Sequence, residues 1–362
     1  MIKYNAKNER IKREYFEYQR EARQKSIATV DNIRKAIDRY EKYTDYKDFK
    51  TFNKRQAVGF KKSFSQTKGV ASKDYLSKST LLSTVRNLKD FFGWVAYQPG
   101  YKNIDIRDIE YLNLSEKDTR IAKSKKQPKV PTIDQIRKVL NCMPYKTDIE
   151  KRNRALIAFT ILTGVRDGAI ASLKIKHIDV EEKIVKQMPD QVKTKFSKTI
   201  YTYFFPVGGD IEQIVVDWIL YLKKELFFDE EAPLFPRTRL TVSSENCFTA
   251  SGLEPVHWQS ANQIRKIFKV EFINAGLSYY SPHCFRNTIT RLGERLCKSA
   301  EDFKAWSQNL GHESPSTTFT SYGYIETHTQ GKIIKEIGTS EKKSTDEKLE
   351  EILARLPKQE LL

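Results

Sequence analysis

Apolar side chains recur every three or four residues along most of the chain, which is the spacing of an amphipathic helix. In the first third of the sequence this spacing predicts helices over 6–44, 53–66, 77–98 and, in a shorter and more polar form, 105–122. Pro99 and Gly100 follow the third of these segments, and both residue types end helices. We therefore expect residues 1–122 to form an all-helical domain.

The helical spacing is interrupted by a basic segment at residues 123–131. This segment holds four lysines and two prolines without apolar periodicity, a composition typical of an extended linker. Helical spacing then returns, with Thr132 as a typical N-cap, over 132–143, 150–162, 210–227, 258–275, 283–298 and 301–310. These segments indicate a second domain over 132–330.

Residues 183–206 depart from helical spacing, because Val, Ile, Thr, Tyr and Phe alternate there with Lys and Gln. Such alternation predicts a small antiparallel sheet. The expected fold class is therefore mainly α with one small antiparallel β-sheet. The tail at 331–362 is polar at first and amphipathic over 345–356. A terminal helix of this kind can pack on its own chain or on a neighbouring copy.

Positive charge is concentrated in the first domain. The 362 residues carry a net charge of +18; residues 1–130 hold 31 Lys and Arg against 16 Asp and Glu, whereas residues 131–362 hold 33 against 30. A regional excess of this size favours double-stranded DNA as partner, because each cation near a phosphate releases a condensed counterion. The candidate DNA-binding residues are Lys54, Arg55, Lys61, Lys62, Lys125 and Lys126.

Several other classes of protein are disfavoured. No apolar run approaches the roughly 20 residues of a membrane-spanning helix, and the first residues lack the apolar core of a secretion signal. The four cysteines show no CxxC spacing, which argues against a disulfide framework or a zinc site. We expect a cytoplasmic, nucleoid-associated protein with no membrane contact.

Four short motifs in the second domain carry residues suited to chemistry. In chain order they are Thr163-Gly164-Val165-Arg166, Lys193-Thr194-Lys195, His283-Cys284-Phe285-Arg286, and Leu310-Gly311-His312 with Tyr322 ten residues later. Together, over about residues 132–330, they resemble the tyrosine recombinase, or phage integrase, family. The helical first domain looks like the core-binding domain of the same family.

The residue types fit metal-free cleavage of a phosphodiester. That reaction needs a nucleophile, an acid for the leaving hydroxyl, and fixed cations around the non-bridging oxygens, where charge grows in the transition state. Arginine suits the last task because its planar fork holds phosphate oxygens bidentately. Arg166 follows an apolar helix and a glycine, and Arg286 lies one helical turn after His283, so both are candidates.

The resemblance implies a role for each of the remaining groups. Arg286 would bind the phosphate, His283 would accept the tyrosine proton, and His312 would donate a hydrogen bond to the phosphate. Family members carry the nucleophile nine or ten residues after the Leu-Gly-His histidine, which selects Tyr322 and leaves Tyr324 as the reserve. A phenol, with a pKa near 10, can also leave again when the strands are rejoined.

The sequence leaves two assignments undecided: which lysine acts as the general acid, and which residue replaces the family's supporting glutamate. Lys193 fits the family's hairpin lysine, which would protonate the departing 5′ oxygen, although Lys195 and Lys198 are close enough to compete. On an antiparallel strand Lys193 and Lys195 would face the same way. Where family members often have a glutamate three residues after the first arginine, this chain has Ala169, and Asp167 could substitute for it.

The resemblance implies a site-specific DNA recombinase that works through a 3′-phosphotyrosine intermediate and needs no metal or nucleotide cofactor. Four protomers would act on two duplexes, with the free protein a monomer or weak oligomer. Two alternatives remain: a type IB topoisomerase-like nicking and rejoining enzyme, and a non-catalytic DNA-binding regulator of the same fold.

Overall fold

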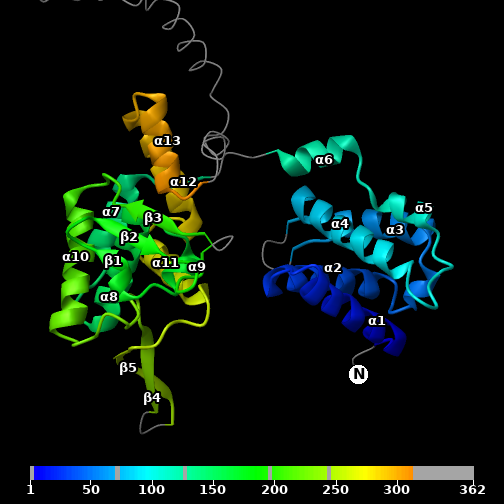
Figure 1. Ribbon diagram of the computed structural model, residues 1–362, viewed down its shortest axis with the longest axis horizontal. Helices are drawn as coiled ribbons and strands as arrows, with labels where there is room; N and C mark the ends of the chain where they lie inside the picture. Colours follow the sequence, from blue (N-terminus) through cyan, green and yellow to red (C-terminus); the bar gives the residue numbers. More distant parts are fainter. Residues whose placement is uncertain (1–3, 70–73, 125–128, 195–197, 243–245, 313–362) are drawn as a thin grey trace, which may run out of the picture. The chain divides into compact units, whose positions relative to one another are not determined.

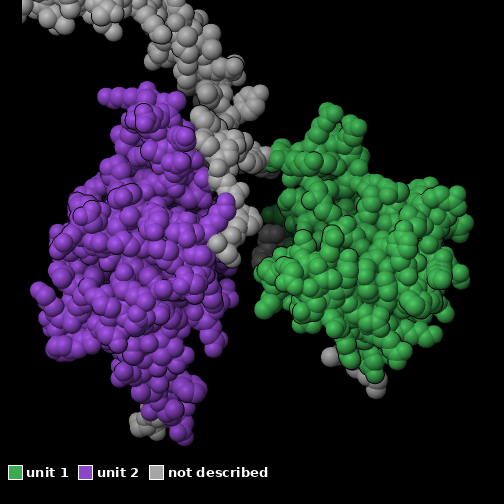
Figure 2. All heavy atoms as spheres, viewed as in Figure 1, with its two compact units in different colours: residues 1–125 green, residues 126–362 purple. Residues whose placement is uncertain are grey.

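The computed structural model describes residues 4–69, 74–124, 129–194, 198–242 and 246–312. The chain divides into two compact units, unit 1 at residues 1–125 and unit 2 at residues 126–362, which Figure 2 shows in different colours. The division falls inside the basic segment 123–131. Each unit has a hydrophobic core of its own. Among the described residues, no helix combines the length and the apolar character needed to cross a membrane.

Unit 1 is built from helices (Figure 1). They are α1 (Ala6–Glu17), the π-helical turn η1 (Tyr18–Ala22), α2 (Ile27–Tyr43), η2 (Phe49–Thr51), α3 (Lys54–Ser65), α4 (Lys78–Val95), α5 (Ile106–Ile109), η3 (Glu110–Leu112) and α6 (Glu116–Lys123). One continuous helix over 6–44, as the spacing predicts, is wrong. Gln24 has a left-handed φ of 49°, and the Ser26 side chain accepts from Thr29 N to begin α2, so the polar residues between Ala22 and Ile27 divide the segment.

Helix α4 supplies the centre of this core. Its apolar residues at three- and four-residue steps are buried, as the sequence predicts: Leu81, Val85, Leu88, Phe91, Phe92 and Val95. The Phe92 ring lies 4.0 Å from that of Phe52 and 5.0 Å from that of Tyr40, measured between centroids. Aromatic rings at these separations add to the free energy of burial. They hold α4 against α2 and the segment that precedes α3.

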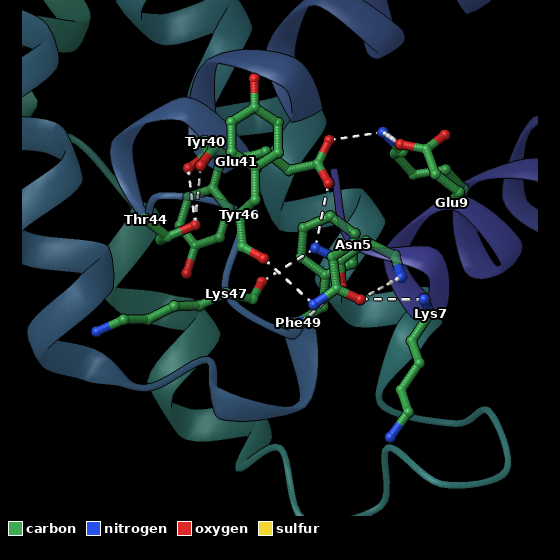
Figure 3. Close-up of polar contacts among 11 residues, drawn as sticks. Asn5, Lys7, Glu9, Tyr40, Glu41, Thr44, Tyr46, Lys47 and Phe49 are labelled. Atoms are coloured by element: carbon green, nitrogen blue, oxygen red, sulfur yellow. Dashed lines mark hydrogen bonds and ion pairs between the residues drawn. The ribbon is translucent and has the colours of Figure 1, made fainter. Parts of the chain in front are cut away.

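A buried polar cluster joins α1 to α2 (Figure 3). Glu41 is 1% exposed and accepts hydrogen bonds from Lys12 Nζ at 2.6 Å and from Asn8 Nδ2 at 3.1 Å. Asn8 also donates to the Lys47 carbonyl and accepts from Phe49 N. Burial raises the pKa of Glu41, and the charge of Lys12 opposes that shift. The ion pair therefore offsets part of the cost of burying this carboxylate.

We expect Lys12→Met to lower the free energy of unfolding of the protein by about 3 kcal/mol, because it leaves the Glu41 charge buried without its partner. Glu9→Gln is the matched control, since Glu9 also pairs with Lys12 but has a half-exposed side chain; its effect should stay below about 1 kcal/mol. Urea unfolding followed by circular dichroism measures both. Equal stability of Lys12→Met and the unaltered protein would contradict the role given to this pair.

Unit 2 surrounds the helix α8 (Asp148–Thr163), which is buried on every side over its last two turns. Around it lie α7 (Ile133–Cys142), α9 (Asp167–Ile170), η4 (Ile175–His177), α10 (Gly209–Lys224), α11 (Asn262–Asn274), α12 (Pro282–Leu296) and α13 (Ala300–Asn309). Thr147 caps α8 and Thr132 caps α7, each in a capping box. These capped helices confirm a mainly α fold.

In the described part of unit 2, two antiparallel sheets accompany the helices. The first runs in the order β1 (Ile178–Asp179), β2 (Ile184–Gln187) and β3 (Ile200–Tyr203), and is the small sheet that the sequence predicts. The second is a hairpin of β4 (Arg237–Val242) and β5 (Phe248–Glu254), which the sequence did not reveal. Its outer residues are exposed on both faces, so no burial pattern marks them. Buried Arg152 of α8 fixes its base by donating to Pro236 O and Thr238 Oγ1.

Candidate active site

The first arginine motif lies at a sharp turn where α8 ends. Gly164 closes α8 with a φ of 60°, a left-handed conformation that favours glycine. A Cβ on Gly164 would lie 2.9 Å from Ile289 Cδ1 of α12, so the Ile289 side chain would have to move to admit it. Arg166 follows as the N-cap residue of α9 and is half-buried. The turn thus holds its guanidinium on a rigid support.

Arg286 of α12 connects three of the sequence motifs. Its side chain is 5% exposed. Nη1 donates to the Gly164 carbonyl, and Nη2 donates to the Leu310 carbonyl and lies 3.2 Å from His312 Nε2. One guanidinium therefore joins the turn before Arg166 to the turn that carries His312.

The electrostatics of this cluster favour an anion. Burial lowers the pKa of Arg166. Burial first, and the nearby charge of Arg166 second, lower the pKa of Arg286 to about 9, so the Arg286 guanidinium stays charged at pH 7. No carboxylate among the described residues contributes to either shift. A buried and a half-buried guanidinium held near each other are both stabilised when a phosphate binds between them.

His312 is held by the same arrangement. Gly311 has a φ of 65°, and a Cβ on it would lie 3.0 Å from Ile200 Cγ2 on β3. His312 N donates to Ser307 O at 3.1 Å, and the side chain is half-buried. The structure therefore brings Arg166, Arg286 and His312 together. His283 lies on the first turn of α12 and is exposed, in contrast to Arg286 one turn later.

Lys193 does not lie on a strand, which corrects that expectation. Strand β2 ends at Gln187, and the chain then turns, with Gln191 N and Val192 N both donating to Met188 O. Lys193 is exposed, and its backbone N donates to Ser172 Oγ at 2.9 Å. The expectation that Lys193 and Lys195 point to the same face of a strand therefore does not apply. Lys195 lies outside the described residues, and Lys198 is exposed just before β3.

Asp167 forms an ion pair that links α9 to α11. Its Oδ2 accepts from Arg265 Nε at 2.7 Å, and its Oδ1 accepts from Gly168 N. Ala169, at the position of the family's glutamate, is 2% exposed. Arg265 contacts Asp167, and Ser172 contacts Lys193. The sequence does not predict either contact, because the two partners lie far apart along the chain.

The remaining candidates are the DNA-binding residues of α3 and several residues that the structure does not describe. Lys54, Arg55 and Lys62 are exposed on α3. Lys61 is half-buried and donates to the Asn113 carbonyl at 2.6 Å, and burial lowers its pKa, so it also holds α3 to the segment after η3. Besides Lys195, further parts of the sequence-based hypothesis lie outside the described residues: Lys125, Lys126, Tyr322, Tyr324 and the amphipathic segment 345–356.

The chain is similar to known proteins over most of its length. Residues 129–328 match the phage integrase family. A tyrosine recombinase XerC from Thermodesulfovibrio yellowstonii is 24% identical over 268 residues, covering 72% of this chain and 75% of the relative. A XerC from Lactobacillus leichmannii is 23% identical over 257 residues, covering 69% and 73%.

Solved structures share the fold. A lambda integrase (75–356) dimer bound to a COC′ core site has a TM-score of 0.58 at 17% identity, covering 88% of this chain and 99% of that one. A XerH recombinase bound to a palindromic difH substrate, in a post-cleavage complex, has a TM-score of 0.55 at 17% identity, covering 88% and 81%. A lambda integrase tetramer bound to a Holliday junction has a TM-score of 0.58 at 17% identity, covering 86% and 79%.

Proposed function

This chain belongs to the phage integrase family of tyrosine recombinases, and from that premise we propose that it cleaves and rejoins DNA at specific sites through a 3′-phosphotyrosine intermediate. The observation that carries the proposal is the cluster of buried Arg286 with half-buried Arg166 and His312, which come from three separate motifs. Such a cluster provides fixed positive charge and hydrogen-bond donors where a phosphate gains charge.

Each step uses a group of this chain. The Tyr322 hydroxyl attacks the scissile phosphorus and gives its proton to His283, while Arg166, Arg286 and His312 bind the non-bridging oxygens. The bond to the 5′ oxygen breaks, and Lys193 protonates that oxygen, which leaves a free 5′-hydroxyl and a 3′-phosphotyrosine. A 5′-hydroxyl then attacks the phosphotyrosine with the acid and base roles reversed. The bond energy is kept, so neither a metal ion nor ATP is required.

Unit 1 and the basic segment would hold the duplex. The exposed cations of α3, Lys54, Arg55 and Lys62, together with Lys61, Lys125 and Lys126, are suited to phosphate contacts, which position a protein on DNA without specifying the sequence. Lambda integrase has been solved as a tetramer on a Holliday junction. We extend this to a homotetramer of the present chain on two duplexes, acting at the nucleoid in the cytoplasm, with a monomer or weak oligomer when free.

Covalent trapping in the host cell tests the proposed reaction. Cells that express the protein are lysed in denaturant, and DNA fragments that remain attached to it are sequenced. We expect one short, recurring sequence with the protein at its 3′ end, so that a 3′ exonuclease is blocked and the 5′ end is a hydroxyl. Attachment to unrelated sequences, with relaxation of supercoils and no strand exchange, would favour the topoisomerase-like alternative. The absence of any covalent complex would favour the non-catalytic regulator.

A further inference from the structure

Asn309 makes unusual hydrogen bonds immediately before the Leu310-Gly311-His312 turn. It is the last residue of α13. Its Oδ1 accepts from Tyr203 N at 2.7 Å, and its Nδ2 donates to Tyr203 O at 2.9 Å. One side-chain amide therefore satisfies both backbone groups of a β3 residue, as a neighbouring strand would. Asparagine near a helix end commonly bonds to its own local backbone, whereas this partner lies 106 residues away.

The backbone of Asn309 strengthens the same connection. Its carbonyl accepts from Thr202 Oγ1 at 3.1 Å, and Thr202 Oγ1 in turn accepts from Gln187 Nε2 at 3.2 Å. Thr202 is 2% and Gln187 4% exposed. The Gln187–Thr202 bond is buried and the Thr202–Asn309 bond is partly buried, so both fix geometry, because an unpaired polar group there would cost free energy. Asn309 is thus joined to β3 by three hydrogen bonds, and through Thr202 to the end of β2.

The opposite side of the turn is held by α12. Arg286 donates to the Leu310 carbonyl, the residue after Asn309, and Gly311 packs on Ile200 of β3. The turn that carries His312 therefore lies between two supports, the sheet through Asn309 and α12 through Arg286. The β2–β3 connection of this sheet contains Lys193, whose backbone is held by Ser172.

We propose that Asn309 is a positioning residue for strand cleavage. It fastens the end of α13 to β3 and so fixes the position of His312 relative to the sheet. It also fixes the Leu310 carbonyl, to which Arg286 donates. The β2–β3 connection of the same sheet carries Lys193. It touches no reacting atom itself. A displacement of about 1 Å at such a site can reduce a rate by about 10²-fold. The proposal rests on the assignment of Arg286 and His312 to the scissile phosphate.

The test compares Asn309→Ala and Asn309→Asp with Gln308→Ala, an exposed neighbour on the same helix. The substrate is a nicked duplex carrying the trapped recombination site. Single-turnover cleavage is measured at saturating protein, and the dissociation constant for the duplex is measured separately. We expect both Asn309 variants to cleave about 10- to 100-fold more slowly with a dissociation constant within about twofold of the unaltered protein, and Gln308→Ala to cleave normally.

Asn309→Asp tests the contact with little risk of misfolding, because aspartate has nearly the same shape as asparagine. It keeps the acceptor for Tyr203 N and loses the donor to Tyr203 O. A folded Asn309→Asp protein that cleaves at the normal rate would overturn the proposal. Loss of DNA affinity with an unchanged cleavage rate would also overturn it. If the unaltered protein and Gln308→Ala fail to cleave, the proposed function itself fails, and the two failures are therefore distinguishable.

Discussion

Tyr322→Phe should abolish covalent DNA capture. The substitution removes only the phenolic oxygen, so the ring keeps its size while the group that attacks phosphorus is lost. Loss of a covalent nucleophile lowers a rate by about 10⁴-fold or more, which places cleavage below detection in a suicide-substrate assay. DNA binding should persist, since Arg166, Arg286 and the exposed cations of α3 are unchanged.

Tyr324→Phe is the matched control, because this second phenol lies two residues further along the same segment. It should cleave within about threefold of the unaltered protein, the range expected for a change outside the reacting groups. If Tyr322→Phe still traps DNA and Tyr324→Phe does not, the nucleophile is the reserve tyrosine. A denaturing gel with labelled DNA measures both variants.

Arg286→Lys should lose cleavage and stability together. Lysine keeps the positive charge but has one nitrogen, which cannot reach Gly164 O and Leu310 O while also binding phosphate. We expect cleavage to fall about 10²- to 10³-fold, the usual effect of removing one donor to a developing oxyanion. The free energy of unfolding should fall by about 1–3 kcal/mol, because a buried carbonyl loses its partner.

Arg166→Lys separates the two effects. Arg166 is half-buried and N-caps α9 through its backbone, without a side-chain cap bond. Its replacement should lower cleavage to a similar extent but leave the unfolding free energy within about 0.5 kcal/mol. Urea unfolding and single-turnover cleavage are measured on the same preparations. An Arg286→Lys protein that is as stable and active as the unaltered one would contradict the arrangement around Gly164 and Leu310.

The sequence was informative wherever local patterns determine structure. Apolar spacing located α3, α4 and most helices of unit 2, and Thr132 was recognisable as a cap. The sequence does not predict the break between η1 and α2, which the structure shows in the left-handed φ of Gln24 and the Ser26 cap of α2. The β4–β5 hairpin was missed because exposed strands lack the alternation that burial imposes.

The sequence predicts which residues belong to the candidate site but not the contacts that hold them together. Short motifs identified Arg166, Arg286 and His312, which the structure brings together. The carbonyls that Arg286 binds and the amide pairing of Asn309 join residues 24 to 122 positions apart, and no local pattern records such contacts. Lys193 was assigned to a strand because alternation continues through a segment that the structure folds into a turn.

The central claim is that the protein becomes attached to DNA through Tyr322. The most direct measurement is mass spectrometry of the covalent complex after nuclease and trypsin digestion. Residues 305–332 form one tryptic peptide that contains both Tyr322 and Tyr324, so fragmentation at Gly323 must separate them. We predict a nucleotide joined through its 3′-phosphate to Tyr322. Attachment to another residue, or through a 5′-phosphate, would contradict the account.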